Sequence, residues 1–374
     1  MHDQPERLSE NKGVQDAEPM EQRESGGTKG FWKKIEERLN ALDSQKIRLT
    51  VQVIFLLATL YTGWRFVLFV HYLRAGGAPV TRPPGVEAFL PLSSLISLKY
   101  WILTGIYNSI HPAGLAIFIA IVLMGILLKR SFCSWVCPIG FLSEYLWKFG
   151  RKIFGRNLVL PKFLDYPLRS LKYILLIFFA WGILGKMSVT VLRAFIYSPY
   201  NRVADIKMLL FFEHLSSFSF WVLVALAVLS IPIKNFWCRY LCPYGALLGF
   251  LSLFSPVKIT RNPTTCIDCK LCTEVCPANI QVHRLNRVVS DECTTCLTCT
   301  SVCPVENTLD VRLPNKKKPI RPWVYGLAIV LIFVLVTGLA RLTGHWKNSI
   351  SDQEYRARLK QIDQPIYNHT SGGR

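Results

Sequence analysis

Two cysteine runs decide the fold and the chemistry of this chain: CIDCKLCTEVCP at residues 266–277 and CTTCLTCTSVCP at residues 293–304. Both have the spacing C-x2-C-x2-C-x3-C-P, in which three closely spaced thiolates wrap one metal centre and the fourth swings away to another. Zinc ribbons use two C-x2-C pairs instead, and disulfides are unexpected in a reducing cytosol. The spacing therefore predicts iron–sulfur clusters.

The spacing is that of bacterial ferredoxins with two [4Fe–4S] clusters, in which the fourth cysteine of each run serves the other cluster. It predicts a small cytoplasmic α+β domain over residues 255–314, which depends on metal ligation for much of its stability. The predicted ligands of cluster 1 are Cys266, Cys269, Cys272 and Cys303, and those of cluster 2 are Cys293, Cys296, Cys299 and Cys276.

Composition indicates a membrane protein. The chain has 374 residues, of which 51% are hydrophobic, and its mean hydropathy is +0.28. The formal charge of +20 could indicate nucleic-acid binding, but the basic residues flank long apolar runs and form no stripe with aromatic residues. We therefore expect a polytopic helical protein with basic cytoplasmic loops and no nucleic-acid partner.

Five apolar runs are long enough to cross about 30 Å of hydrocarbon as helices. Two further apolar stretches, Phe89–Ile110 and Val191–Leu215, are interrupted by proline or charged residues and are predicted to be interfacial or re-entrant. The predicted spans are Leu49–Leu73, Pro112–Leu128, Leu168–Gly185, Phe218–Ile233 and Trp323–Leu342.

Basic residues predict the orientation. The connection 129–172 carries nine Lys or Arg against two acids, whereas the connections 74–111 and 186–217 carry three and four. The positive-inside rule then places the N-terminus and the ferredoxin-like domain in the cytoplasm and the tail outside. We expect a multi-pass protein of the bacterial inner membrane.

These features predict five segments. The first is a largely disordered cytosolic lead-in without a signal peptide, in which Phe31–Arg48 is equally well read as a surface helix or a linker. The predicted segments are 1–48 (lead-in), 49–254 (membrane domain), 255–314 (ferredoxin-like domain), 315–345 (fifth span and flanks) and 346–374 (short periplasmic tail).

A second cysteine motif, C-x3-C-P, occurs as FCSWVCPIG at residues 132–140 and as WCRYLCPYG at residues 237–245. The first cysteines are 105 residues apart, which predicts an internal repeat in parallel topology with both pairs at the same depth. The four thiols could hold a third Fe–S cluster, form two redox-active dithiols, or simply pack as small residues. They are Cys133, Cys137, Cys238 and Cys242.

An electron carrier in the bilayer needs a lipid-soluble partner, and quinol is the obvious one. Its oxidation releases protons, so the site needs an ionisable acceptor near the outer surface among apolar and aromatic groups. His111 is the first choice, because it lies at the outer end of the second predicted span. The full set of predicted quinone-site residues is His111, Tyr107, Asp205, Lys207 and His214.

With both motif types in this order, the chain resembles the membrane polyferredoxins of the NapH/NosR/CcoG group. The resemblance runs from about Phe89 to Pro314 and is strongest to YccM-type 4Fe–4S membrane proteins, which share an extra C-terminal span and a short tail. The chain has no room for the Ig-like domain of CcoG-type proteins or the flavin-binding domain of NosR. The resemblance implies quinol-linked electron transfer toward a respiratory or maturation partner.

Two functions are compatible with the motifs. The first is a redox conduit between the quinone pool and an unidentified redox protein, as in a quinol dehydrogenase subunit, with no catalytic side chains of its own. The second is a metal-handling or maturation factor, for example one that reduces copper during assembly of a respiratory enzyme. The scarcity of methionine, five residues in all, counts mildly against the second.

Overall fold

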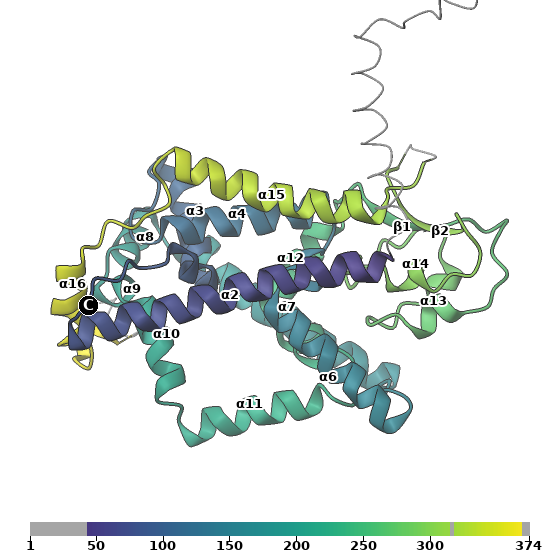
Figure 1. The fold of residues 1–374 in the computed structure, drawn as a ribbon, viewed down its shortest axis with the longest axis horizontal. Helices are drawn as coiled ribbons and strands as arrows, with labels where there is room; N and C mark the ends of the chain where they lie inside the picture. Colours follow the sequence, from purple (N-terminus) through teal and green to yellow (C-terminus); the bar gives the residue numbers. More distant parts are fainter. Residues whose placement is uncertain (1–42, 315–317, 369–374) are drawn as a thin grey trace, which may run out of the picture. The chain divides into compact units, whose positions relative to one another are not determined.

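The computed structural model describes residues 43–314 and 318–368, most of which are helical (Figure 1). The expected lead-in and most of the expected surface helix lie outside the described residues. Residues 44–48, which the sequence assigned to that lead-in, instead form the first turn of helix α2 (Ser44–Ala75).

Local signals explain the ends of α2. The Asp43 carboxylate accepts a hydrogen bond from the backbone N–H of Gln45 at 3.1 Å, which satisfies a free N–H of the first turn. At the other end, the chain leaves the helix through Gly76, whose φ of 80° is readily adopted only by glycine. The 32 residues between are about 48 Å long as a helix, more than a bilayer core.

Among the described residues, three helices are long and apolar enough to cross a membrane. They contain three of the five predicted spans, those that begin at Leu49, Leu168 and Trp323. The helices are α2, the continuous helix Lys162–Lys186 formed by α7 (Lys162–Ala180) and the π-helical segment η2 (Trp181–Lys186), and α15 (Pro322–Leu342).

The other two predicted spans form shorter helices. Helix α4 (Pro112–Leu127) has 16 residues, about 24 Å of helix. Helix α11 (Ser217–Leu229) follows α10 (Ala204–Glu213) with a bend of 83°, and the two together could form one broken span. The predicted number of five spans therefore remains a prediction.

The interrupted stretches are helical as well, in short pieces set by proline and glycine. Pro91 begins α3 (Pro91–Thr104), and Gly105, with a φ of 72°, ends it. The second stretch contains α8 (Val189–Ile196), α9 (Pro199–Arg202) and α10, and the short helix η1 (Pro84–Phe89) precedes the first.

Helix α4 is the centre of the membrane domain. It is apolar on all sides and most of its residues are buried, because α3, α12 (Pro243–Ser252) and α15 pack around it. Helix α15 also packs along α2 (Figure 1). In contrast, every residue of α11 keeps part of its surface exposed, and Figure 1 shows this helix away from the others.

The cysteine motifs and the tail form shorter elements. The amphipathic helix α6 follows the first C-x3-C-P motif and ends at Gly155. These elements are α5 (Phe132–Trp135), α6 (Pro138–Phe154), η3 (Trp237–Leu241), α16 (Asp352–Leu359) and η5 (Pro365–Tyr367).

The ferredoxin-like region is built around a two-stranded antiparallel sheet. Strand β1 (Lys258–Arg261) pairs with β2 (Leu309–Arg312), so the sheet joins the beginning and the end of the region. Between the strands lie the cysteine runs, with the short helices α13 (Leu271–Glu274) and α14 (Thr298–Ser301) and the 3-10 turn η4 (Val282–Arg284).

The two cysteine runs adopt the same backbone conformation. Asp268 and Lys270 in the first run have φ of 53° and 64°, and the equivalent Thr295 and Leu297 in the second have φ of 49° and 58°. Left-handed residues on both sides of a cysteine curl the chain tightly, at an energetic cost that the surroundings must offset. The curled loops bring the first three cysteines of each run around a common space.

Candidate iron–sulfur and thiol sites

The structure gathers the eight ferredoxin-type cysteines around two pockets of about 380 Å³ each. One pocket is lined by Cys276, Cys293, Cys296 and Cys299. The other is lined by Cys266, Cys269, Cys272 and Cys303. Each pocket thus combines three cysteines of one run with the last cysteine of the other run.

The donor sets fit four-iron clusters better than single ions. Within the described residues, no three His, Cys, Asp or Glu side chains lie close enough to share one metal ion. A single zinc ion would require thiolates about 2.3 Å from one point, whereas a cubane accepts each thiolate at a different iron. All twelve cysteines are free thiols, so every one is available for ligation.

The two pockets differ in exposure. Cys276 is buried, and burial raises the pKa of its thiol to about 12, so a positively charged centre is needed to hold it as a thiolate. Cys269 is exposed in the other pocket. There the backbone N–H of Asp268 and the Arg261 guanidinium hold the pKa of Cys266 below its usual value.

The four C-x3-C-P thiols also come together. Cys238 interacts electrostatically with Cys242, Cys137 and Cys133, which belong to both motifs. Cys137 and Cys242 cap α6 and α12, each directly before the proline that begins the helix, and the Cys242 sulfur accepts a hydrogen bond from Gly245 N–H at 3.2 Å. Burial raises the pKa of Cys137 to about 12, so this thiol stays protonated at neutral pH unless a cationic centre binds it.

The glycine that follows each C-P pair is required by close packing. A Cβ atom at Gly140 would lie 2.0 Å from the carbonyl oxygen of Cys133. A Cβ atom at Gly245 would lie 2.5 Å from the guanidinium of Arg130. The motif is therefore C-x3-C-P-x-G because the backbone of each pair is in contact with its neighbours.

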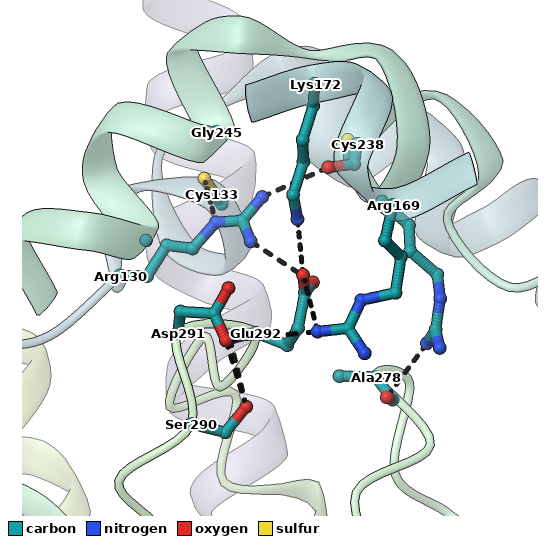
Figure 2. Close-up of polar contacts among 12 residues, drawn as sticks. Arg130, Cys133, Arg169, Lys172, Cys238, Gly245, Ala278, Ser290, Asp291 and Glu292 are labelled. Carbon is teal, nitrogen blue, oxygen red and sulfur yellow. Dashed lines mark hydrogen bonds and ion pairs between the residues drawn. The ribbon is translucent and has the colours of Figure 1, made fainter. Parts of the chain in front are cut away.

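Arg130 joins the two thiol pairs to the ferredoxin-like region (Figure 2). Its Nε lies 3.4 Å from the Cys133 sulfur, and its guanidinium donates to the carbonyl of Cys238 at 3.1 Å. It also pairs with Glu292 at 3.5 Å, beside Cys293. Lys172 and Arg169 of α7 pair with the same carboxylate, so one buried anion is balanced by three cations.

A cavity of about 610 Å³ lies between the C-x3-C-P motifs and the second cysteine run. Cys133, Cys238 and Cys296 all line it, so residues from three cysteine motifs border one space. Its other lining residues include Arg48, Arg130, Glu144, Trp147, Arg239, Pro277, Ala278, Glu292 and Thr294.

Direct hydrogen bonds hold the second cysteine run against the membrane helices. Ser134 Oγ donates to the carbonyl of Thr294 at 2.7 Å, and Trp135 Nε1 donates to that of Thr295 at 3.0 Å. Gln45, at the start of α2, donates to the carbonyl of Cys296 at 3.2 Å. The sequence prediction missed these contacts, because nothing in the spacing of a motif reports which loop it packs against.

The predicted quinone-site residues separate into two groups. His111 and Asp205 lie in a buried network at the far end of α4 from the thiols. Arg82 pairs with Glu87 at 2.8 Å and with Asp205 at 2.7 Å. His111 Nε2 contacts the Asn201 carbonyl at 2.7 Å, while its Nδ1 lies 3.7 Å from Glu87 and has no hydrogen-bond partner among the described residues.

The remaining predicted residues lie outside this network. Tyr107 donates its hydroxyl to the carbonyl of Pro112 at 3.0 Å, and its ring packs at a tilt against that of His345. Lys207 is half-buried, and His214 is an exposed residue at the end of α10. Glu87, which the sequence analysis did not single out, is fully buried and central to the network.

Comparison with known proteins supports the interpretation of both cysteine motifs as parts of 4Fe–4S domains. The 4Fe-4S dicluster domain family matches residues 258–323. The 4Fe-4S binding domain family matches twice, at residues 110–157 and 214–262, and each match contains one C-x3-C-P motif. No solved structure matches the chain.

The putative electron transport protein YccM of Escherichia coli is 40% identical to this chain over 86% of its length and 91% of that relative. The chain belongs to the YccM family. Protein NirI of Paracoccus denitrificans is 32% identical over 44% of the chain and 23% of that relative. The methylamine utilization ferredoxin-type protein MauN of the same organism is 29% identical over 40% of the chain and 48% of that relative.

These relatives confirm the predicted membership of the NapH/NosR group of ferredoxin-type 4Fe–4S proteins. As a member of the YccM family, the chain is an iron–sulfur protein of electron transport. Its long apolar helices make it a membrane protein.

Proposed function

We propose that this protein is an electron conduit of the bacterial inner membrane with two [4Fe–4S] clusters on the cytoplasmic side. Cluster 1 is ligated by Cys266, Cys269, Cys272 and Cys303, and cluster 2 by Cys293, Cys296, Cys299 and Cys276. Two pockets, each lined by one of these sets, support the assignment. When bound, each cluster supplies a one-electron carrier.

The observation that carries the proposal is the cavity shared by Cys133, Cys238 and Cys296. It supports a position of Cys133 and Cys238 next to cluster 2 and not next to cluster 1. The expected path therefore runs through the thiol site, which would carry electrons as a third Fe–S cluster or as a disulfide–dithiol couple, to cluster 2 and then to cluster 1, whose Cys269 is exposed. A soluble redox partner would exchange electrons at that exposed end.

Quinol is the proposed donor. Its oxidation to quinone releases two electrons and two protons, so one quinol matches two one-electron carriers. The buried network around His111 is the proposed proton-accepting site, because His111 Nδ1 lacks a hydrogen-bond partner among the described residues and faces the Glu87 carboxylate.

The position of this network has a consequence for charge movement. His111 and Lys129 flank the two ends of α4, whose 16 residues are about 24 Å long. That distance is most of the hydrocarbon core. Electrons released beside His111 would cross the membrane to the thiols while the protons remain on the outer side, which makes the reaction electrogenic.

The test is the double variant Cys133→Ser/Cys238→Ser in the full chain, reconstituted anaerobically in lipid vesicles with a water-insoluble quinol. We expect quinol-driven reduction of the clusters to be lost, while dithionite still reduces both. Conversion of the exposed Ser301 to alanine serves as the control and should leave both reactions unchanged. Undiminished quinol-driven reduction in the double variant would overturn the proposal.

A metal-handling function is the second candidate, favoured by four soft thiol ligands close enough to interact electrostatically with one another. It predicts that the purified protein binds Cu(I) and that the same double variant loses this binding. Loss of copper binding with intact quinol-driven cluster reduction would favour this function over the conduit.

A further inference from the structure

Lys129 and Lys234 occupy the same position in the two C-x3-C-P motifs, four residues before the first cysteine. The Lys129 side chain is completely buried, and Lys234 is only 7% exposed. Burying an ammonium group is strongly unfavourable unless it is paired. Two buried lysines at equivalent positions therefore do more than set membrane orientation, which exposed lysines would do equally well.

Lys129 reaches the segment before Cys293. Its Nζ donates to the carbonyl of Ser290 at 2.8 Å and contacts that of Val289 at 3.4 Å. The same Ser290 carbonyl also accepts the backbone N–H of Cys293 at 3.2 Å. The ammonium thus lies at the start of the loop that wraps cluster 2.

Lys234 contacts the chain segment that contributes Cys276 to the same pocket. Its Nζ donates to the carbonyl of Glu274 at 3.0 Å and to that of Cys276 at 3.2 Å. Cys276 comes from the first cysteine run, whereas Cys293 comes from the second. The two repeats therefore each place one lysine on one of the two chain segments that cluster 2 joins.

A third cation from the membrane domain accompanies them, since Arg48 of α2 interacts electrostatically with Cys296. In contrast, the cations that line the pocket of cluster 1, Arg261 and Lys270, belong to the ferredoxin-like region itself, and Lys270 is exposed. The membrane domain thus adds positive charge selectively around cluster 2.

We infer that Lys129 and Lys234 form a clamp that docks the cluster 2 half of the domain on the two repeats and raises the reduction potential of that cluster. This inference rests on the proposed two-cluster function. A four-thiolate [4Fe–4S] centre is anionic and becomes more negative when it takes one electron, so a fixed ammonium nearby stabilises its reduced form. The clamp makes cluster 2 a better acceptor for an electron from the thiol site, with no bond made or broken.

The test is a potentiometric EPR titration of the full chain, purified anaerobically, with Lys129→Met and Lys234→Met compared with the parent protein. At a fixed potential, each variant should lower the ratio of reduced to oxidised cluster 2 about tenfold. This corresponds to a midpoint potential of cluster 2 that is lower by about 59 mV for one electron. Cluster 1 should titrate as before. Lys152→Met removes an exposed lysine of α6 and should shift neither cluster.

Iron content separates failure of the clamp from failure of the function. An unchanged cluster 2 potential in methionine variants with full iron would overturn the clamp and leave the two-cluster function standing. A parent protein without clusters would overturn the function itself. If the Lys234→Met protein lacks cluster 2, the Lys234→Arg protein is compared with it. Full iron in Lys234→Arg would support a requirement for positive charge at this position, and an equal loss of iron would contradict that requirement.

Discussion

The two cysteine pockets share their ligand spacing and their backbone conformation but not their surroundings. The pocket of cluster 2 lies against α2, α5 and both C-x3-C-P motifs, and its Cys276 is only 8% exposed. The pocket of cluster 1 opens to solvent beside Ile267, which is 65% exposed, and Cys269. The two cysteine runs have the same spacing, but the elements that pack against them make one pocket buried and the other exposed.

This difference orders the electron path. A buried pocket beside the membrane thiols suits exchange within the protein, whereas an exposed pocket suits exchange with a soluble partner. The contacts that distinguish the pockets are hydrogen bonds and ion pairs from the membrane domain, so replacing them tests the distinction.

The largest effect is expected from removing one cluster at a time. Cys299→Ala should lose about four of the eight irons and abolish quinol-driven reduction of the remaining cluster 1, because the path is cut upstream. Cys269→Ala should lose the same number of irons but leave cluster 2 reducible by quinol. EPR of quinol-reduced samples distinguishes them, and equal behaviour of both variants would contradict the order.

The next effect concerns the ion pair between Arg48 and Glu144 near cluster 2. The guanidinium nitrogen and the carboxylate oxygen are 2.6 Å apart, and the two side chains are 4% and 11% exposed. Arg48→Met should lower the free energy of unfolding by up to about 3 kcal/mol, since it leaves the largely buried carboxylate with Lys148, at 2.6 Å, as its remaining cation. Arg74→Met, on the same helix, removes an exposed pair with Glu213 and should cost about 1 kcal/mol or less. Chemical unfolding in detergent measures both, and similar losses would contradict the distinction.

The same pair predicts a pH dependence. Burial alone would raise the pKa of Glu144, but Arg48 and Lys148 outweigh it and hold the pKa below its usual value. Because the folded-state pKa is depressed, the stabilisation is present above the unfolded pKa of about 4.3 and is lost as the pH falls through the folded-state value. The stability difference between the parent and Arg48→Met should therefore shrink in acid.

A smaller effect is expected from Gly140→Ala. The added Cβ would lie 2.0 Å from the Cys133 carbonyl, so the backbone must shift, and overpacking of this kind costs about 1–3 kcal/mol. Gly63→Ala on α2 meets nothing within 4 Å and should raise stability by up to about 1 kcal/mol through helix propensity. Thermal unfolding in detergent compares the two, and a neutral Gly140→Ala would argue against tight packing of the thiol site.

The smallest effect is expected on the cluster 1 side. Asp310 and Arg312 form a pair at 2.9 Å with both side chains 23% exposed. Asp310→Asn should change the free energy of unfolding by about 1 kcal/mol or less. A loss as large as that of Arg48→Met would show that both pockets depend on ion pairs equally.

Local patterns predicted much of this protein. The apolar runs that begin at Leu49, Leu168 and Trp323 became long helices because length and composition suffice to specify a span. The apolar run that begins at Pro112 forms a helix of only 16 residues, because the chain leaves the helix at Leu128 and Lys129, just before the first C-x3-C-P motif.

The site was predicted in part. Cysteine spacing specifies a curled loop by itself, so the grouping into pockets could be anticipated from residues such as Cys276 and Cys303. The roles of Arg130, Glu87 and Lys234 could not, because they depend on partners such as Glu292, Gly114 and Cys276, which are 162, 27 and 42 residues away in the sequence. His214 and Lys207 were attractive as ionisable groups in sequence, but the helix that carries them leaves them outside the buried network.

The most direct test is the amount of iron and acid-labile sulfide per chain in anaerobically purified full-length protein, with EPR after dithionite and after quinol. We expect about eight irons and two interacting S = 1/2 signals, with about twelve irons if the C-x3-C-P thiols hold a third cluster. Fewer than about four irons in strictly anaerobic protein would contradict this expectation.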